Sequence, residues 1–184
     1  MQVIRKSEYR VMPWKNGGGE TTEIFVTPPA GNFDWRVSIA TVNVDGPFST
    51  FVGYERHIMM LSGQGMALDV AGRGKFDLES LKPFSFSGDA QVNGSLSHGP
   101  VEDFNLMVRR DFGRGSLRFM ACTVGDKLGS RESLHLIHVL QGECEIGNNQ
   151  VHSNDSFCLG TGELVSPSAS LKLAICEITP RSLP

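Results

Sequence analysis

The sequence predicts an all-β protein, and three observations support this prediction. Apolar residues occur in short runs separated by glycine, proline, asparagine, aspartate and serine, and 21 of the 184 residues are glycine. No long window shows apolar residues at helical spacing. Two segments, one in each half of the chain, share a related pattern. Short strands at turn-marked intervals are typical of a β-sandwich or a β-barrel.

The candidate strands follow one another along the whole chain. Each is a run rich in β-branched, aromatic or alternating apolar residues, bounded by turn formers. The expected strands span residues 34–44, 56–62, 66–71, 83–87, 104–109, 117–124, 134–141, 143–146, 156–159 and 171–178.

An internal repeat relates the two halves of the chain. Residues 58–65 (IMMLSGQG) align with residues 137–144 (IHVLQGEC), so a strand that ends in a glycine turn occurs twice. Residues 83–89 (PFSFSGD) and 155–160 (DSFCLG) form a second pair, in which a strand with Phe and Ser reaches a glycine. Two copies of one small β-unit explain both pairs, and chance similarity between two hairpins is the alternative.

Length and charge limit the classes of function. A chain of 20.1 kDa can bury a sizeable core as one compact unit. Its net charge is -3, and no basic run could neutralise a series of phosphates, so we expect no nucleic-acid partner. Residues 1–16 mix charged and apolar positions and predict neither a signal peptide nor a membrane span. We therefore expect a cytoplasmic protein with no membrane partner.

The cysteines predict no redox or zinc chemistry. All four lie in the second half, in apolar or alternating runs and without a Cys-x-x-Cys pair. Reduced, mostly buried thiols are the expected state, because free cysteine behaves as a small hydrophobic residue. A disulfide or a zinc site is the alternative for Cys122, Cys144, Cys158 and Cys176.

Three motifs near the N-terminus carry a family resemblance. They are residues 13–21 (PWKNGGGET), 34–40 (DWRVSIA) and 45–49 (DGPFS), and in this order and spacing they are similar to the HutD/Ves family. Residues 53–56 (GYER) and 103–107 (DFNLM) extend the resemblance over most of the first two-thirds of the chain. The last third matches in outline.

This resemblance implies a fold, an organisation and a role. The fold is a two-cupin (bicupin) antiparallel β-barrel of jelly-roll type, produced by internal duplication. The implied domains are an N-terminal cupin-like half at residues 1–110, which carries the motifs, and a C-terminal cupin-like half at residues 111–184, tightly packed as one unit. The implied role is accessory or regulatory, and is linked to bacterial histidine utilisation or a stress response.

Metal-dependent catalysis is not expected. Cupin enzymes hold a metal through a His-x-His pair and a carboxylate before the first glycine turn, with a third His on a later strand. The third position is Gln91 in the first half and Val165 in the second half. His135 and His138 remain, but on a strand they point to opposite faces. We therefore expect no metal and no cofactor.

The segment 34–44 predicts a polar surface beside a packing surface. Strand alternation places Trp35 and Val37 on one face and Arg36 and Ser38 on the other. A ligand could lie against Arg36. The alternative is that this arginine pairs with an Asp or Glu at the edge of the sheet.

The family motifs add further polar residues to this surface. An arginine fork can grip a carboxylate through two hydrogen bonds, a lysine adds a point charge, and asparagine supplies both a donor and an acceptor. We expect a small carboxylate as the ligand, similar to formylglutamate, formiminoglutamate or urocanate, in a cavity of the first half, with the second half as scaffold. The candidate ligand-binding residues are Lys15, Asn16, Arg36, Ser49, Arg56 and Asn105.

Two features of the first motif have open interpretations. The run from Gly17 to Gly19 could form part of an anion-holding turn or a plain bend. Trp14 could be a lid over a ligand or an anchor in the core, and the core is favoured.

An enzymatic role has no strong candidate residue. No serine or cysteine has a visible His-carboxylate partner, and thiols in apolar strands have a raised pKa. The alternative to a binding protein is an atypical cupin enzyme in which Glu20, Glu23 or His57 carries a proton. A structural or protein-partner module is a third alternative. Whether the chain forms a homodimer is left open.

Overall fold

The computed structural model describes residues 1–29 and 31–181 of the protein. In this part of the chain the single helical element is one turn of 3-10 helix, η1 (Lys6–Glu8). The paired strands of the sheets are all antiparallel. The prediction of an all-β protein is confirmed. No helix among the described residues is long and apolar enough to cross a membrane.

Two sheets make up what we call the first half. The larger sheet contains, in spatial order, β2 (Arg10–Pro13), β3 (Gly19–Thr27), β4 (Trp35–Val42), β11 (Val101–Arg109), β6 (Tyr54–Ser62) and β9 (Phe84–Ser87). The smaller sheet contains β5 (Gly46–Phe48), β10 (Val92–Leu96), β7 (Met66–Val70) and β8 (Gly74–Leu78).

Two further sheets make up the second half. The larger one contains, in spatial order, β1 (Gln2–Ile4), β16 (Ser156–Leu159), β13 (Leu134–Gln141), β17 (Leu171–Pro180) and β12 (Gly113–Cys122). The smaller one is the hairpin of β14 (Glu143–Ile146) and β15 (Asn149–His152).

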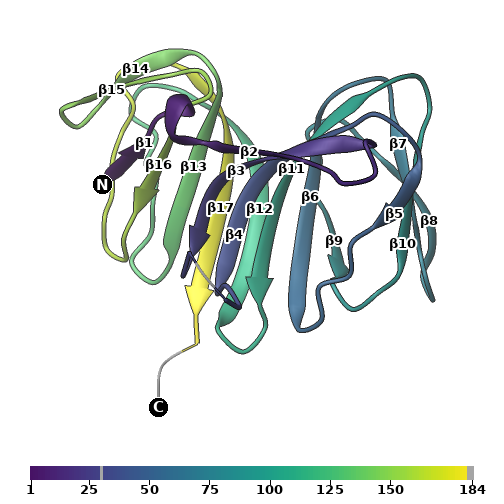
Figure 1. Ribbon diagram of the computed structural model, residues 1–184. Coiled ribbons are helices and arrows are strands. Elements are labelled where there is room, and N and C mark those ends of the chain that lie inside the picture. The colour runs from purple at the N-terminus through teal and green to yellow at the C-terminus, as the bar shows by residue number, and fades with distance from the viewer. Residues whose placement is uncertain (30, 182–184) are drawn as a thin grey trace.

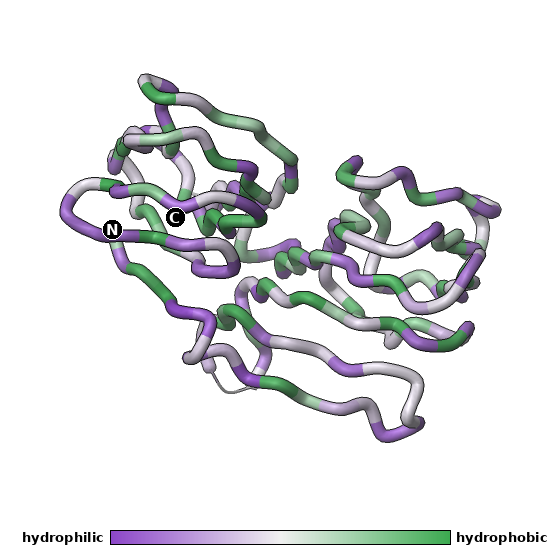
Figure 2. Tube along the Cα trace, turned by 90° about the horizontal axis from the view of Figure 1, so that it is seen from above, coloured by the Kyte–Doolittle hydropathy of each residue, from purple (hydrophilic) through white to green (hydrophobic). Residues whose placement is uncertain are grey.

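The four sheets form consecutive layers with apolar residues between them (Figure 1). One core lies between the two sheets of the first half and includes Ile58, Met60 and Leu68. A second core lies between the two sheets of the second half. The third core, with Phe104 and Leu136, joins the larger sheets of the two halves, and we call it the seam. Strand alternation explains this arrangement, because each larger sheet contributes buried apolar residues to two cores, one on each of its faces. Figure 2 shows hydrophobic residues distributed along the chain in both halves.

Neither half closes into a barrel in the described residues. The sheets of each half face one another across a core instead of sharing strand hydrogen bonds, and edge strands such as β2 and β9 remain. The closed barrel that the resemblance implied is therefore not formed. The strands on the two sides of each core are linked by side-chain packing.

All ten expected strands are present; β13, β14 and β16 have the predicted bounds, and the other seven have shifted ends. The sequence prediction missed shorter strands and one long strand, β3, which begins at Gly19 and contains Glu20 and Glu23. The glycine run and the two charged residues resemble a loop locally. Pairing with β2 on one side and β4 on the other makes the segment a strand.

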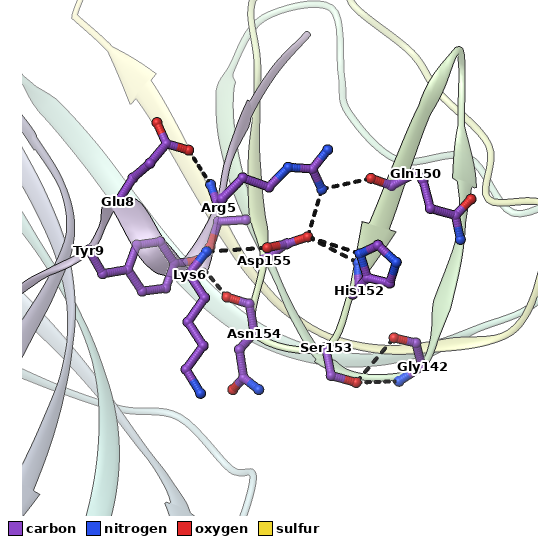
Figure 3. A network of polar contacts seen from close by, with 11 residues as sticks. Arg5, Lys6, Glu8, Tyr9, Gly142, Gln150, His152, Ser153, Asn154 and Asp155 are labelled. Atoms are coloured by element: carbon purple, nitrogen blue, oxygen red, sulfur yellow. Dashed lines mark hydrogen bonds and ion pairs between the residues drawn. The ribbon is translucent and has the colours of Figure 1, made fainter.

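The N-terminal segment crosses from one half to the other. β1 pairs with β16 of the second half, whereas β2 pairs with β3 of the first half. Asp155 holds the segment in place, because it accepts hydrogen bonds from Arg5 Nη1 (2.7 Å) and from the backbone N–H of Lys6 (3.2 Å) (Figure 3). The Tyr9 hydroxyl donates to the carbonyl of Asn154 at 2.8 Å. The division of the chain at residue 110 stays a prediction.

Candidate functional site

A group of polar and charged side chains lies on the inner face of the larger sheet of the first half. This face also carries Ile58 and Met60, which pack against the smaller sheet. Strand alternation brings side chains from four neighbouring strands to the same face. We call this group the polar cluster, and its members are Glu23 on β3, Arg36 and Ser38 on β4, Arg56 on β6, and Asp103 and Asn105 on β11.

The strand register brings the members of the cluster together. Ser38 lies opposite Asn105 on one side and opposite Glu23 on the other. Met107 of β11 lies opposite both Arg36 and Arg56, so the two arginines flank the same strand. The prediction that Arg36 and Ser38 share a face opposite Trp35 is confirmed, because Trp35 packs in the seam.

The polar cluster is unusually buried for its charge. Asp103 is 0% exposed, Asn105 is 6% exposed and Arg56 is 7% exposed. Charged residues are rarely buried to this extent unless each is paired, because desolvation costs several kcal/mol per ion. Such a cluster indicates a role other than stabilising the fold.

Arg36 is already paired with a carboxylate. Its Nε lies 2.8 Å from Oε2 of Glu23, and both side chains are largely buried. The sequence left this pairing open as an alternative for Arg36 but placed it at a sheet edge. The structure differs on that point, because β4 lies between β3 and β11.

Arg56 has no carboxylate within ion-pair distance in the described part of the chain. Its Nη1 donates a hydrogen bond of 3.0 Å to the backbone carbonyl of Ser49. Its guanidinium carbon lies 4.9 Å from the ring centre of Phe86 and 5.5 Å from those of Phe48 and Phe51. Burial lowers the pKa of Arg56 to about 10, and nearby Asp103 opposes this shift.

Asp103 is the most buried member of the cluster. Asn105 Nδ2 donates a hydrogen bond to its Oδ1, whereas its Oδ2 has no hydrogen-bond partner among the described residues. Burial raises the pKa of Asp103 to about 7, although the hydrogen bond from Asn105 and the charge of Arg56 both lower it. Asp103 therefore exchanges its proton near neutral pH.

The structure brings together only part of the predicted ligand-binding set. Arg36, Arg56 and Asn105 converge in the polar cluster, and Ser49 contributes its backbone carbonyl. Whether they bind a ligand stays a prediction. The cluster has two further members outside the predicted ligand-binding set: Asp103, which the sequence prediction missed, and Glu23, which it named only as a possible proton carrier. Asp103 and Asn105 are two positions apart, so a strand places them on the same face. This spacing could have identified Asp103 from the sequence.

Lys15 and Asn16 lie away from the polar cluster. Both are exposed in the turn between β2 and β3, next to the Val42 end of β4. Arg36 lies near the other end of β4, six residues before Val42. At the rise of an extended strand, the two residues are about 20 Å apart. Asn16 uses its Oδ1 to accept a 3.0 Å hydrogen bond from the N–H of Gly18.

The neighbours of these residues have structural roles. Trp14 packs against the core of the first half and donates a 2.8 Å hydrogen bond to Oγ1 of Thr21, so the interpretation as a core anchor holds. A Cβ at Gly19 would lie 2.1 Å from the carbonyl oxygen of Thr41, so this position requires glycine.

Two surface cavities lie outside the polar cluster. One, of about 330 Å³, is lined by residues that include Tyr54, Arg109 and Arg110. Both of its arginines are already paired with aspartates. The other, of about 320 Å³, lies at the seam and includes His138 and Lys172. Neither cavity is lined by a member of the cluster, and we place the candidate site at the cluster because its buried charges are the unusual chemistry of the molecule.

The histidines do not form a metal site with the cluster. His57 lies on the opposite face of β6 from Arg56, and its Nδ1 is 2.7 Å from Oγ of Ser85. His138 packs in the seam against Phe104, with Nδ1 2.9 Å from Oγ of Ser156. Burial lowers the pKa of His57 and that of His138 to about 4, so both are neutral at pH 7.

The donor set of the cluster does not suit a metal cation. Two arginines bring positive charge to the place where a metal would bind. Among residues 1–29 and 31–181, no group of three His, Cys, Asp or Glu side chains is arranged to hold a metal ion.

The candidate proton carriers and the cysteines lie apart. Glu20 is opposite Thr41 and Glu23 is opposite Ser38, and these two residues of β4 point to opposite faces. His57 lies on the face of β6 opposite Arg56, which is the face turned away from the polar cluster. Glu23 belongs to the cluster, so the three candidates do not converge. The four cysteines are free. Burial raises the pKa of Cys158 to about 12 and raises the pKa of Cys176 well above its ordinary value.

Comparison with known proteins identifies the family. The sequence profile of the HutD family matches residues 6–176. The chain belongs to the HutD family. It is 39% identical over 148 residues to a 21.2 kDa protein of the hutC 3' region in Pseudomonas putida, covering 79% of this chain and 77% of the relative. It is also 35% identical to the protein Ves of Citrobacter koseri, covering 94% and 92%.

Solved structures agree with this assignment. HutD from Pseudomonas fluorescens, solved in a formate condition, superposes with a TM-score of 0.86 at 33% identity and covers 98% of this chain and 99% of that chain. A bacterial pirin from Escherichia coli superposes with a TM-score of 0.70 at 10% identity and covers 98% and 99% of the two chains. At this identity the likeness concerns the cupin-like fold alone.

Proposed function

We propose that this HutD-family protein binds a small carboxylate at the polar cluster and acts as an accessory or regulatory protein of histidine utilisation in the cytoplasm. The observation that carries the proposal is Arg56, a buried cation with no carboxylate partner among the described residues. A buried arginine fork is suited to a planar anion. The names of the relatives, which refer to hut genes and to HutD, support the biological setting.

The proposed binding mode uses the existing contacts of Arg56. The backbone carbonyl of Ser49 is a neutral acceptor on Nη1. A ligand carboxylate in its place makes a charge-assisted hydrogen bond, which is roughly twice as strong as a neutral one. The rings of Phe48, Phe51 and Phe86 keep the guanidinium away from water, and this strengthens its attraction for an anion.

The proposed ligand class is an acid that also carries an amide-like or imidazole group. Asn105 and Ser38 lie opposite one another beside the arginines and supply both donors and acceptors. Formylglutamate, formiminoglutamate and urocanate each combine a carboxylate with such a group. These acids are the first compounds to test.

Isothermal titration calorimetry with the three acids at millimolar concentration tests the proposal. At least one acid should release or absorb heat and raise the melting temperature. Arg56→Met should weaken its binding more than tenfold, because it removes a charge-assisted contact. Arg36→Met should weaken binding by a smaller factor, since Arg36 is already paired with Glu23.

Arg73→Met is the matched control for these variants. Arg73 also stacks on two phenylalanine rings, Phe76 and Phe84, at 5.2 and 5.3 Å, but it is exposed. This variant should bind as the unmodified protein does. If none of the three acids binds, or if Arg56→Met binds as tightly as Arg73→Met, the proposed site is wrong.

We further propose that the two halves are cupin units produced by duplication. A shift of 79 positions places Ile58 on Ile137 and Gly63 on Gly142, and both glycines have a positive φ, of 106° and 105°. The strand pairing supports the same shift. β6 and β13 each have a pairing irregularity at equivalent positions, Leu61 and Leu140.

A further inference from the structure

The four charged groups of the polar cluster balance one another only while no anionic ligand is bound. Glu23 neutralises Arg36 at 2.8 Å. Arg56 and Asp103 remain, and they attract one another without forming a direct ion pair within the described chain. With all four groups charged, the net charge is zero, so a carboxylate that binds here makes the cluster net negative. In a site removed from water, this imbalance is costly.

The position of Asp103 offers a way to remove the imbalance. Its carboxyl group is fully buried and has one hydrogen bond, from Asn105 to Oδ1, while Oδ2 has no partner among the described residues. An ionised carboxylate needs more hydrogen bonds than this when it is buried. A protonated Asp103 is neutral, and its hydroxyl becomes a donor.

We propose that Asp103 determines how many anionic groups the polar cluster accepts: it holds a proton while one ligand carboxylate lies against Arg56, so the protein binds its acid together with one proton. This inference rests on the proposed function, because it concerns the same site. With Asp103 neutral, Glu23, Arg36 and Arg56 leave one net positive charge, and one ligand carboxylate balances it. The cluster therefore accepts one carboxylate group of the ligand.

The charged groups around Asp103 favour uptake of a proton when a carboxylate binds. Arg56 on β6 favours its ionised form, and a carboxylate bound to Arg56 weakens that influence. Arg36 on β4 is neutralised by Glu23 on β3. Glu102, its neighbour on β11, points to the other face, where it accepts a hydrogen bond of 3.0 Å from Ser62, and its charge raises the pKa of Asp103 by the smallest of the four influences. The added ligand charge thus raises the pKa of Asp103 above its value of about 7 in the free protein.

The test is calorimetry of the full chain at pH 8 and pH 6.5, each in two buffers with different ionisation enthalpies. N-formylglutamate is the main probe, because its carboxyl groups stay ionised over this range and contribute no proton exchange. Formiminoglutamate and urocanate follow in the same design. The dependence of the heat on the buffer gives the number of protons taken up per ligand.

We expect uptake of most of one proton per ligand at pH 8 and a much smaller uptake at pH 6.5. Affinity should fall about fivefold between pH 7 and pH 8, because binding requires a proton that about half of the free protein holds at pH 7 and only about a tenth holds at pH 8. Asp103→Asn should bind without proton uptake and without this pH dependence. Glu102→Gln is the matched control, because it removes the adjacent carboxylate on the same strand. Glu102 is the smallest of the influences on the pKa of Asp103, so this variant should keep most of the uptake.

The outcomes separate the inference from the proposed function. Clear binding without buffer dependence overturns the role of Asp103 and leaves the site intact. Uptake that persists in Asp103→Asn also overturns it. Absence of heat for all three acids at both pH values overturns the function and the inference together. If Asp103→Asn does not fold, the buffer dependence of the unmodified protein and of Glu102→Gln still decides the question.

Discussion

The inner faces of the two halves are built on the same strand pairing but differ in chemistry. In the first half, two polar residues of β11 lie opposite apolar residues of β6. In the second half, two apolar residues of β17 lie at the corresponding positions opposite β13. The pair Asp103–Met60 of the first half corresponds to Leu173–Val139 of the second half. In the same way, Asn105–Ile58 corresponds to Ile175–Ile137.

The difference concerns what fills each inner face. The second half fills its inner face with buried apolar residues, as a stable core requires. The first half replaces part of that packing by buried charges, which do not stabilise a fold in proportion to their cost. At the position of Arg56 the second half has His135, which is also buried and has an unpartnered Nδ1 among the described residues. The inner face of the second half is therefore expected to contribute more to stability than that of the first half, where the proposed binding chemistry lies.

The largest expected effect on the free energy of unfolding comes from a polar substitution on the inner face of the second half. Ile175→Asn should lower the free energy of unfolding by about 3–5 kcal/mol, because it removes buried apolar volume and adds an amide without partners. Ile175 is 1% exposed and belongs to the core of the second half. Urea unfolding followed by circular dichroism measures the change, and Ile175→Val, at about 1 kcal/mol, is the control. A loss of less than about 1.5 kcal/mol for Ile175→Asn would remove the contrast between the two inner faces.

The next effect concerns pH and Asp103. Its pKa is about 7 in the folded protein, above the ordinary value of 3.8, so the folded state binds more protons between these values. The contribution of Asp103 to stability is therefore complete below pH 4 and is lost as pH rises to 7. Asp103→Asn should gain stability relative to the unmodified protein over this range, on the order of a few kcal/mol.

His57 and His138 act in the opposite direction in the same range. Their pKa values of about 4 lie below the ordinary value of 6.5, so their contribution is complete above pH 6.5 and is lost as pH falls to 4. Both proteins contain the two histidines. The difference in unfolding free energy between Asp103→Asn and the unmodified protein at each pH therefore cancels the histidine contribution. Denaturant unfolding at pH 5, 6, 7 and 8 supplies the data. A constant difference across this series would show that Asp103 has an ordinary pKa.

A smaller effect is expected where the second half holds the N-terminal segment. Asp155→Ala should cost about 2 kcal/mol, because it removes the acceptor for Arg5, for Lys6 N–H and for the N–H of His152. Amide exchange should become faster in residues 1–9. Arg5→Ala, which removes a partner that is 42% exposed, should cost less than about 1 kcal/mol. Equal costs for the two variants would argue against Asp155 as the centre of this contact.

The smallest effect on stability is expected when the first half is made apolar. The double variant Arg56→Met and Asp103→Leu should change the free energy of unfolding by less than about 1 kcal/mol or raise it, because apolar residues often replace buried charges without loss. The same variant should no longer bind any of the three acids. Thermal unfolding and calorimetry on one preparation check both results. A loss of several kcal/mol would mean that the cluster is structural.

Local sequence patterns determined much of the fold. Strand alternation in residues 34–42 correctly placed Arg36 and Ser38 on one face and Trp35 on the other. The opposite directions of His135 and His138 followed from the same period, and the structure confirms them, since His138 lies in the seam, away from the inner face of its own half. The motifs between residues 13 and 107 were sufficient to identify the family. These features depend on residues close together in the chain, whose geometry the strand period sets.

The tertiary structure alone decided which polar groups meet. Glu23 reaches Arg36 because β3 pairs with β4, and Asp103 is buried because β11 lies between β4 and β6. The same pairing leaves Lys15 exposed at a distant turn, although its motif includes the start of β3. β1 joins the sheet of the second half, far from its neighbours in sequence. The neighbours of a strand, and so the partners and the pKa of each buried charge, depend on contacts between distant segments, which no local period encodes.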